Sequence, residues 1–383
     1  MKILAIDDQQ LILLSLEKKL VELGYNVKTA DSGKLGIEFF DSFNPDLVIV
    51  DINMHEVSGI DVVKYIRVEK KSDVPLMVMS GNNDENIIVE GFDLGINDYM
   101  KKPVSLNEVA ARVKRLIGDS PEKKNITDKE IGANRIIREN CIGVVIPCYN
   151  EETRLLSKEF TDFVHSNLGY HLCFVNDGST DNTLDVLENL KKGREDNISV
   201  YDCEKNGGKG EAVRQGVLFL SKDSQLDYIG YLDADLSTDF KDFDDLVKTI
   251  EGSDYKIVSG SRMSRMGANI TKESARKIIS MTINFIIQNI LGMKFNDTQC
   301  GAKIMDRDIV NNMFNKKFIT RWLFDVEIFM RMKRFYGKEK AIAYICEQPL
   351  KRWIHADGSK LSMKDSVKIV GQLMQIAIHY RKK

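Results

Sequence analysis

The sequence predicts an α/β protein made of two consecutive domains, and three observations support this prediction. Short apolar runs alternate with segments whose apolar residues recur at helical spacing, which is typical of doubly wound parallel sheets. This alternation stops near residue 118 and starts again at residue 141, after a polar and charged stretch. The length of 383 residues also fits two or three domains of roughly 150 residues each.

The first domain is expected to span residues 1–118, and the polar stretch 119–140 is expected to be a linker. Two segments, Leu11–Leu23 and Val104–Ile117, space their apolar residues as a helix does. Short apolar runs predict strands between these segments and before them. The predicted strands are Ile3–Ile6, Leu47–Val50 and Leu76–Met79.

The second domain is expected to span residues 141–355, followed by a basic amphipathic helix at residues 356–383. Helical segments separate most of its predicted strands, as in the first domain. The predicted strands are Ile142–Ile146, Leu172–Val175, Ile198–Tyr201, Tyr228–Leu232 and Lys256–Ser259.

The composition argues against several classes of protein. The 55 basic and 57 acidic residues give a net charge of −2, so the overall charge shows no footprint for nucleic acid. The six cysteines form no C-x-x-C pair, which argues against a zinc site or a disulfide framework and favours a reducing compartment. No stretch reaches the ~20 apolar residues that a membrane helix needs. The expected location is therefore the cytoplasm, with peripheral contact to the inner face of the cell membrane as an option.

Polar side chains follow the predicted strands of the first domain. Because the carboxyl ends of parallel strands meet at one edge of a sheet, these groups are expected to converge. Crowded carboxylates repel one another unless a cation joins them, and oxygen ligands favour Mg²⁺. A carboxylate beside Mg²⁺ and a lysine can attack a phosphoryl group and form an acyl phosphate. The converging residues are Asp7 and Asp8 after the first strand, Asp51 after the second, Ser80 after the third and, further on, Lys102.

The order of these residues resembles the response-regulator receiver family over residues 1–118. The resemblance implies that Asp51 accepts a phosphoryl group from a histidine kinase or a phosphotransfer protein. It also implies that Asp8, Asp51 and the Asn53 carbonyl hold Mg²⁺. Ser80 and Lys102 would contact the phosphoryl oxygens, and Tyr99 would be the switch. The matching motifs are Asp7-Asp8, Asp51-Ile52-Asn53-Met54, Gly59, Ser80-Gly81 and Asp98-Tyr99-Met100-Lys101-Lys102-Pro103.

One position departs from the receiver pattern. Members of the family often carry proline where His55 stands. This difference bears on the stiffness of the loop and leaves the acceptor residue unchanged. His55 itself is expected to be an exposed loop residue.

The second domain also places polar loops at strand ends. Asp233 and Asp235 follow the strand Tyr228–Leu232 at positions i and i+2, so both can reach one divalent cation that bridges a diphosphate. The glycine-rich turn Asn206–Gly210 precedes a helix, and its amides and Lys209 are candidates for facing a diphosphate. Each pattern alone is also compatible with ordinary turn chemistry. Two earlier loops, Pro147–Glu152 and Asn176–Thr183, could bind a base or a ribose hydroxyl through their acids.

Two residues in the later part of this domain have ordinary explanations. Cys300 is expected to be a packed cysteine rather than a nucleophile, because no histidine lies near it in the sequence. Trp322 is expected to be a packing residue or part of a pocket wall.

Taken in order, these motifs resemble the family 2 glycosyltransferases with the GT-A (Rossmann-like) fold over about residues 141–355. The dolichyl- or polyprenyl-phosphate glucosyltransferases are the more similar branch. The motifs read IPCYNEE, VNDGSTDNT, NGGKGEAV, LDADLST, GSR, DTQCGAK, RWLFDVE and a late DGSK. The resemblance implies Pro147, Tyr149, Glu151 and Asp177 at the nucleoside, Lys209 and Arg262 at phosphates, Asp233 and Asp235 on Mg²⁺ or Mn²⁺, and Gln299, Arg321 and Asp325 on the sugar and acceptor side.

The resemblance further implies a metal-dependent transfer of a hexose by single displacement with inversion. Mannose-transferring relatives often carry glutamine at the position of Ser237, so its absence favours glucose and UDP-glucose as the donor. A lipid phosphate acceptor is already ionised and needs no general base. For a hydroxyl acceptor, Asp325 is the candidate base.

Because one chain joins the receiver to the transferase, phosphorylation of Asp51 is expected to regulate sugar transfer. Ile278–Leu291 and Val367–Tyr380 are candidates for contact with a membrane surface, with a core helix as the equal alternative. The expected partners are a histidine kinase or phosphotransfer protein, a nucleotide sugar, polyprenyl phosphate and a second copy in a homodimer. Two other functions stay open: a transferase that acts on a soluble glycan or protein with the receiver as a dimerisation module, and a non-catalytic adaptor that binds nucleotide sugar.

Overall fold

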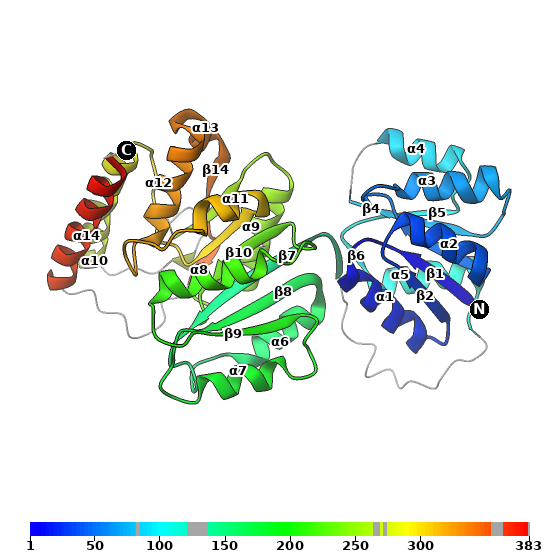
Figure 1. The fold of residues 1–383 in the computed structure, drawn as a ribbon, viewed down its shortest axis with the longest axis horizontal. Helices are drawn as coiled ribbons and strands as arrows, with labels where there is room; N and C mark the ends of the chain where they lie inside the picture. The colour runs from blue at the N-terminus through cyan, green and yellow to red at the C-terminus, as the bar shows by residue number, and fades with distance from the viewer. Residues whose placement is uncertain (82–84, 121–135, 263–268, 271–273, 354–362, 382–383) are drawn as a thin grey trace. The chain divides into compact units, whose positions relative to one another are not determined.

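The computed structural model describes residues 1–81, 85–120, 136–262, 269–270, 274–353 and 363–381. The chain divides into two compact units, and each is an α/β fold (Figure 1). The first unit consists of residues 1–141 together with 161–170. The second consists of residues 142–160 together with 171–383. The α/β class predicted from the sequence is therefore confirmed for both.

The first unit contains a five-stranded parallel sheet in the order β2-β1-β3-β4-β5. This is the strand order of flavodoxin-like doubly wound folds. The three strands predicted here are confirmed. β2 was not predicted because it is a partly buried edge strand without a clean apolar run. The strands are β1 (Lys2–Ile6), β2 (Asn26–Ala30), β3 (Leu47–Asp51), β4 (Leu76–Ser80) and β5 (Asp98–Lys101).

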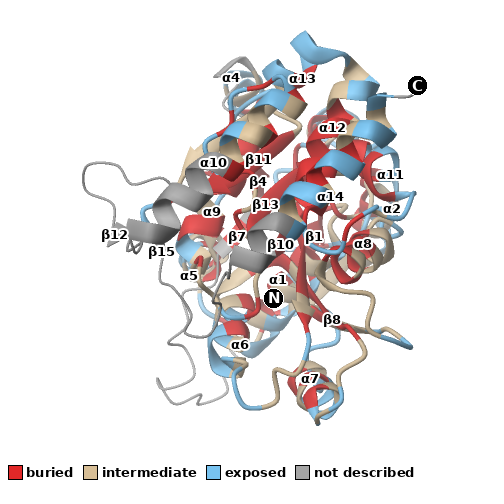
Figure 2. Ribbon diagram, turned by 90° about the vertical axis from the view of Figure 1, so that its left-hand side faces the viewer, coloured by how far each residue is buried: buried red, intermediate tan, exposed pale blue. Residues whose placement is uncertain are grey.

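Helices cover both faces of this sheet. Figure 2 shows that the buried residues are concentrated in the strands. α1 and α5 contribute to the apolar cluster on one face, and α2 and α3 to the cluster on the other. α5 begins later than expected because the Ser105 hydroxyl caps it, accepting the Glu108 amide at 3.1 Å. The helices are α1 (Gln10–Glu22), α2 (Gly33–Phe43), α3 (Gly59–Lys64), α4 (Glu85–Asp93) and α5 (Leu106–Ile117).

The first unit also includes residues that follow the expected linker. The short strand β6 (Val104–Ser105) pairs antiparallel with the start of β7 (Ile136–Cys148), with Val104 opposite Ile137. Ile137 and Leu168 are buried in the same cluster as the apolar residues of α1 and α5. Of the expected linker, residues 121–135 lie outside the described residues and 136–140 are strand. The apolar core of the first unit therefore draws on side chains well beyond residue 118.

The second unit is built on a mixed sheet in the order β14-β11-β13-β10-β7-β8-β9. β13 runs antiparallel to both of its neighbours, β10 and β11. All five strands predicted for this unit are confirmed, whereas β13 and β14 were not predicted. The remaining strands are β8 (Asn167–Asn176), β9 (Ile198–Asp202), β10 (Tyr228–Leu232), β11 (Ile257–Ser261), β13 (Ala302–Asp306) and β14 (Ile345–Pro349), with a separate pair β12 (Asn269–Ile270) and β15 (Arg352–Trp353).

Aspartates cap two helices of this unit. Asp239 accepts the Asp242 amide at the start of α9, and Asp306 accepts the Asp308 amide at the start of α11. Within the described residues, no helix is long and apolar enough to cross a membrane. The helices are α6 (Ser157–Ser166), which begins in this unit, α7 (Thr183–Lys191), α8 (Lys209–Leu220), α9 (Phe240–Glu251), α10 (Ser274–Leu291), α11 (Arg307–Phe314), α12 (Phe324–Tyr336), α13 (Lys338–Tyr344) and α14 (Met363–Arg381).

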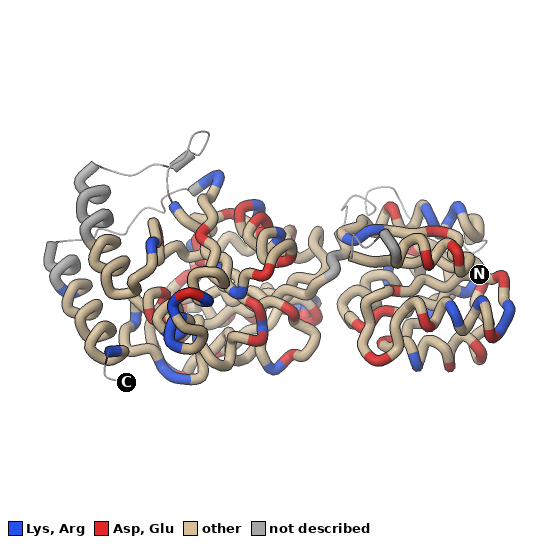
Figure 3. The backbone as a smooth tube through the Cα atoms, turned by 90° about the horizontal axis from the view of Figure 1, so that it is seen from above, with Lys and Arg blue, Asp and Glu red and all other residues tan. Residues whose placement is uncertain are grey.

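Charge is mixed along both units. Figure 3 shows basic and acidic residues interspersed over each of them. This matches the near-neutral net charge of −2.

Leu168 gives a direct test of the composition of the first unit. Replacing this buried side chain by alanine removes packing against α1 and α5 and should destabilise the unit by about 2–5 kcal/mol. Hydrogen exchange of the α1 and α5 amides in the full chain measures the loss. Val21→Ala, at a half-exposed position of α1, is the control and should change stability by no more than about 0.5 kcal/mol. Unchanged exchange in Leu168→Ala would contradict the assignment.

Candidate functional site

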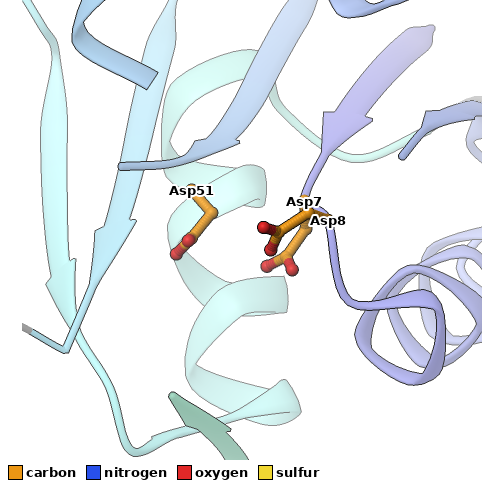
Figure 4. A group of neighbouring side chains, drawn as sticks. All are labelled: Asp7, Asp8 and Asp51. Atoms are coloured by element: carbon orange, nitrogen blue, oxygen red, sulfur yellow. The ribbon is translucent and has the colours of Figure 1, made fainter. Parts of the chain in front are cut away.

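Three carboxylates meet at the carboxyl edge of the sheet in the first unit. Oxygens of Asp7, Asp8 and Asp51 all lie within 4.8 Å of one another (Figure 4). The Lys102 ammonium lies 3.0 Å from Asp7 Oδ2 and 2.8 Å from Asp51 Oδ1. Ser80 is buried at the end of β4. The structure therefore brings the predicted groups together.

Burial makes this cluster electrostatically costly. Burial raises the pKa of Asp7 to about 6, although Lys102 acts in the opposite direction. Burial also raises the pKa of Asp8, and the Asp51 charge adds to that shift. For Lys102, burial would lower the pKa, but the charges of Asp7 and Asp51 outweigh it and raise the pKa. Three acids against one lysine leave an excess of negative charge, which suits a divalent cation with oxygen ligands.

The backbone around Asp51 is closely packed. A side chain at Gly59 would place its Cβ 2.1 Å from the Asp51 carbonyl oxygen, so only glycine fits there. The Asn53 amide donates to Asp51 Oδ2 at 3.1 Å. Asn53 is exposed, and Tyr99 is partly buried in β5. His55 is exposed, as predicted from the sequence.

The second cluster lies at the carboxyl end of β10. Asp233 is partly buried and forms an ion pair with Lys209, the first residue of α8. Asp235 is exposed, and the Ser237 amide donates to its Oδ1 at 2.9 Å. The Leu236 amide donates to the Asp233 carbonyl at 3.1 Å and closes the turn. The two acids thus leave the strand in one tight turn, with a lysine beside the first.

The two loops assigned to a nucleoside are joined to each other by hydrogen bonds. The Asn150 amide donates to Ser179 Oγ at 3.0 Å, and the Glu151 amide donates to Thr183 Oγ1 at 2.7 Å. Glu151 is also 2.8 Å from Arg154, and burial raises the pKa of its carboxyl. These contacts hold the loops after β7 and β8 as one wall, next to the exposed Tyr149.

The glycine-rich turn differs from its predicted role. The Gly207 and Gly208 amides donate to the two carboxylate oxygens of Asp177 at 2.8 and 2.9 Å. The expectation that these two amides face a diphosphate is therefore wrong, and Asp177 instead fixes the turn in place. Gly178 has a φ of +61°, and a Cβ there would lie 2.5 Å from the Asn206 amide nitrogen, so the approach requires glycine.

Arg262 is held by a two-pronged ion pair. Its Nε and one terminal nitrogen donate to the two oxygens of Asp297 at 2.6 and 2.8 Å. Burial would raise the pKa of Asp297, but the Arg262 charge and hydrogen bonds outweigh it and lower the pKa to about 2. Glu347 on β14 supports the pair by accepting the Asp297 amide and the Ser261 hydroxyl, both at 2.7 Å.

Asp325 is the second residue of α12 and is 5% exposed. Its Oδ1 accepts a hydrogen bond from the Tyr231 hydroxyl and another from the Lys303 ammonium at 2.7 Å. Burial, followed by the charge of Asp325, raises the pKa of Tyr231, so its hydroxyl stays protonated and donates. Asp325 Oδ1 is therefore occupied by hydrogen bonds from Tyr231 and Lys303.

The remaining predicted residues are placed as follows. Cys300 is buried, and burial raises the pKa of its thiol to about 11, which confirms the packed-cysteine interpretation. Trp322 is 66% exposed, so it is not a packing residue of the core, and its role as part of a pocket wall stays a prediction. Arg321 is exposed, its carbonyl accepts the Gly210 amide at 3.1 Å, and Gln299 is partly buried.

Three residues of this site received no role from the sequence: Lys303, Gly301 and Glu347, although the first two belong to the DTQCGAK motif. A charged residue inside the apolar run Ala302–Met305 was the available signal for Lys303. Gly301 and Glu347 gave no comparable signal, because their importance arises from contacts across the sheet.

Comparisons with known proteins identify the family of each unit. The family model described as response regulator receiver domain matches residues 3–114, and the model described as glycosyl transferase family 2 matches residues 143–314. The dolichyl-phosphate beta-glucosyltransferase of Dictyostelium discoideum is 30% identical over 254 residues, which are 62% of this chain and 74% of that protein.

Two further relatives match different parts of the chain. The dolichyl-phosphate beta-glucosyltransferase of Drosophila melanogaster is 32% identical over 58% of this chain and 69% of that protein. The alkaline phosphatase synthesis transcriptional regulatory protein PhoP of Bacillus subtilis is 36% identical over 30% of this chain and 48% of that protein. The chain is therefore a member of the family 2 glycosyltransferases that carries a response-regulator receiver domain at its N-terminus.

Proposed function

We propose that the second unit transfers glucose from UDP-glucose to a polyprenyl phosphate, with inversion at the anomeric carbon. The observation that carries this proposal is the acid pair Asp233 and Asp235 at the exit of β10, with Lys209 on the first acid. The names of the relatives, dolichyl-phosphate beta-glucosyltransferases, supply the class of sugar and acceptor.

The donor set fits a divalent cation. Asp233 and Asp235 offer carboxylate oxygens from one tight turn, and oxygen ligands suit Mg²⁺ and Mn²⁺. When bound there, the cation would supply charge stabilisation to the leaving diphosphate. Lys209 would add a second positive charge on the same side. The wall formed by the loops of Tyr149 and Glu151 would hold the nucleoside.

The acceptor side needs a cation and no base. An ionised lipid phosphate already carries the attacking oxygen, so no residue has to remove a proton. Arg262, fixed by Asp297, is our candidate for binding that phosphate. Gln299 and Arg321 would lie toward the sugar. Asp325 is a poor candidate for a base because its Oδ1 is bonded to Lys303 and Tyr231.

A polyprenyl acceptor also requires a surface that meets the membrane. On α14, Val370, Met374 and Ile378 are exposed at helical spacing, while Leu373 and Ile376 are buried. Phe285 of α10, against which α14 packs, is 66% exposed. Basic residues Lys368 and Arg381 stand on the same helix. An exposed apolar stripe with lysine and arginine is typical of helices that lie in a membrane interface.

We also propose that phosphorylation of Asp51 by a histidine kinase or phosphotransfer protein, with Mg²⁺ on Asp8, Asp51 and the Asn53 carbonyl, regulates the transfer. In support, β6 follows Lys102 by two residues and pairs with the start of β7. β7 begins in the first unit and ends in the second, at the loop of Tyr149. A change in the positions of Lys102 and Tyr99 on phosphorylation would therefore act on β7, which runs without interruption to the loop of Tyr149.

Purified protein with Mn²⁺, polyprenyl phosphate and a panel of UDP- and GDP-sugars should transfer glucose from UDP-glucose. Asp233→Asn and Asp235→Asn should each lower the rate at least about 100-fold, because the leaving diphosphate loses its charge stabilisation. Chelation of the metal should have the same effect, and Asp254→Asn serves as an exposed control. Thin-layer separation of the lipid product measures the outcome.

Each alternative function has its own result in this assay. Transfer to short water-soluble acceptors without lipid would favour the soluble-acceptor function. Binding of UDP-sugars without any transfer or hydrolysis would favour the adaptor and contradict the proposal.

The membrane surface is tested by flotation with anionic liposomes. The triple change Val370→Ser, Met374→Ser and Ile378→Ser should abolish flotation, because these side chains supply the apolar area that enters the interface. Ile342→Ser, at a half-exposed position of α13, is the matched control and should float as the wild type does. Equal flotation of the wild type, the triple variant and the control would contradict the proposal that α14 binds the membrane.

Regulation is tested by measuring transfer with and without a phosphodonor. The wild-type rate should change by about fivefold or more, the size expected of coupled sites. Asp51→Ala should show one rate under both conditions, whereas Asp31→Ala, an exposed acid on the same unit, should respond like the wild type. Identical rates for wild type and Asp51→Ala with the donor would reject regulation.

A further inference from the structure

The second unit contains a fully buried lysine, Lys303. Lys303 is the second residue of β13 and is 0% exposed. Lysine is almost never fully buried unless it is paired, since removing an ammonium group from water is costly. This costly position lies opposite Tyr231, which stands two residues before Asp233 in the sequence.

The Lys303 ammonium has two hydrogen-bond acceptors and lies near an aromatic ring. Its ammonium donates to Asp325 Oδ1 at 2.7 Å and to the Cys300 carbonyl at 2.8 Å. The ring of Tyr231 lies 5.4 Å from it, within the range of a cation–π contact. Tyr231 also donates its hydroxyl to the same Asp325 oxygen. Lys303, Asp325 and Tyr231 thus form a closed buried network, which we call the lysine network.

The lysine network reaches Asp233 through two residues of backbone. By bonding the Cys300 carbonyl, Lys303 fixes the turn that leads into β13. The next residue, Gly301, packs directly on Asp233: a Cβ at Gly301 would lie 1.9 Å from Asp233 Oδ2. The pairing of β10 with β13, with Tyr231 opposite Lys303, places these residues face to face. The Asp233 carboxylate is therefore confined by backbone that the lysine holds.

Stability alone does not account for such a network. Replacing a buried ion pair by uncharged residues is often neutral or stabilising, because the desolvation cost disappears with the charges. Groups behind a metal ligand, by contrast, commonly set its orientation and affinity. The location of the network, behind one of two acids at a strand exit, matches the second case.

We propose that Lys303 is a positioning residue: together with Asp325 and Tyr231 it holds the Cys300–Gly301 backbone against Asp233, and so sets the carboxylate for a divalent cation. This inference rests on the proposed function of the acid pair. It gives Asp325 a structural task in the site instead of that of a base.

The test measures Mn²⁺ binding in the presence of UDP by the electron paramagnetic resonance signal of free Mn²⁺. All proteins are the full chain carrying Asp8→Asn and Asp51→Asn, so that the receiver cluster does not contribute. Lys303→Met should weaken Mn²⁺ binding about 10- to 100-fold, as expected for a group behind a ligand. Excess Mn²⁺ should largely restore its glucose transfer. Lys256→Met, which removes the partly exposed pair with Asp306 at the far end of β13, should bind Mn²⁺ normally.

A double variant separates positioning from folding. Lys303→Met leaves Asp325 buried without its cation and should lower the melting temperature. Lys303→Met with Asp325→Asn removes both charges and should recover the melting temperature, while Mn²⁺ binding stays weak.

Recovery of both properties in the double variant, or normal Mn²⁺ binding in Lys303→Met, would overturn the proposal. Loss of transfer in Asp325→Asn with normal Mn²⁺ binding would also overturn it, since Asp325 would then act on the acceptor. Absence of Mn²⁺ binding in the parent chain would instead refute the proposed function itself.

Discussion

The antiparallel pairing of β10 with β13 is the constraint on which the transferase site depends. It places Gly301 against Asp233 and Lys303 beside Tyr231, and β13 runs antiparallel to both of its neighbours, β10 and β11. A parallel strand could not return its first residues to the carboxyl end of β10. The reversed strand therefore brings a closely packed glycine and a buried lysine to the place where the two acids leave the sheet.

Both units contain carboxylates that lie close together at strand ends and are partly neutralised by a lysine. Each collects carboxylates at strand exits and sets one lysine against them: Lys102 against Asp7 and Asp51, and Lys209 against Asp233. In the first unit the lysine is buried and the acids are crowded, so burial is the largest influence on the pKa of Asp7 and Asp8. In the second, Asp235 is exposed, which leaves room for a large anionic ligand to approach.

The sequence predicted the elements that have one clear apolar period and failed where tertiary contacts decide. The strand Tyr228–Leu232 was predicted with its observed bounds, because it is a continuous apolar run that ends in acids. β13 was missed because Lys303 interrupts its pattern, although that lysine proves to be internal. Likewise, glycines before a helix suggested an anion site, but Asp177 already accepts two of their amides. The residues that carry chemistry were readable as motifs, whereas the residues that hold them in place were visible only across the sheet.

The most direct measurement of the central claim is anomalous diffraction from a crystal of the full chain grown with Mn²⁺ and UDP. The account predicts one manganese peak between Asp8 and Asp51 and a second one between Asp233, Asp235 and the diphosphate. The first peak serves as the internal positive control for metal loading. A crystal that shows the receiver peak and ordered UDP, but no manganese at Asp233 and Asp235, would contradict the account.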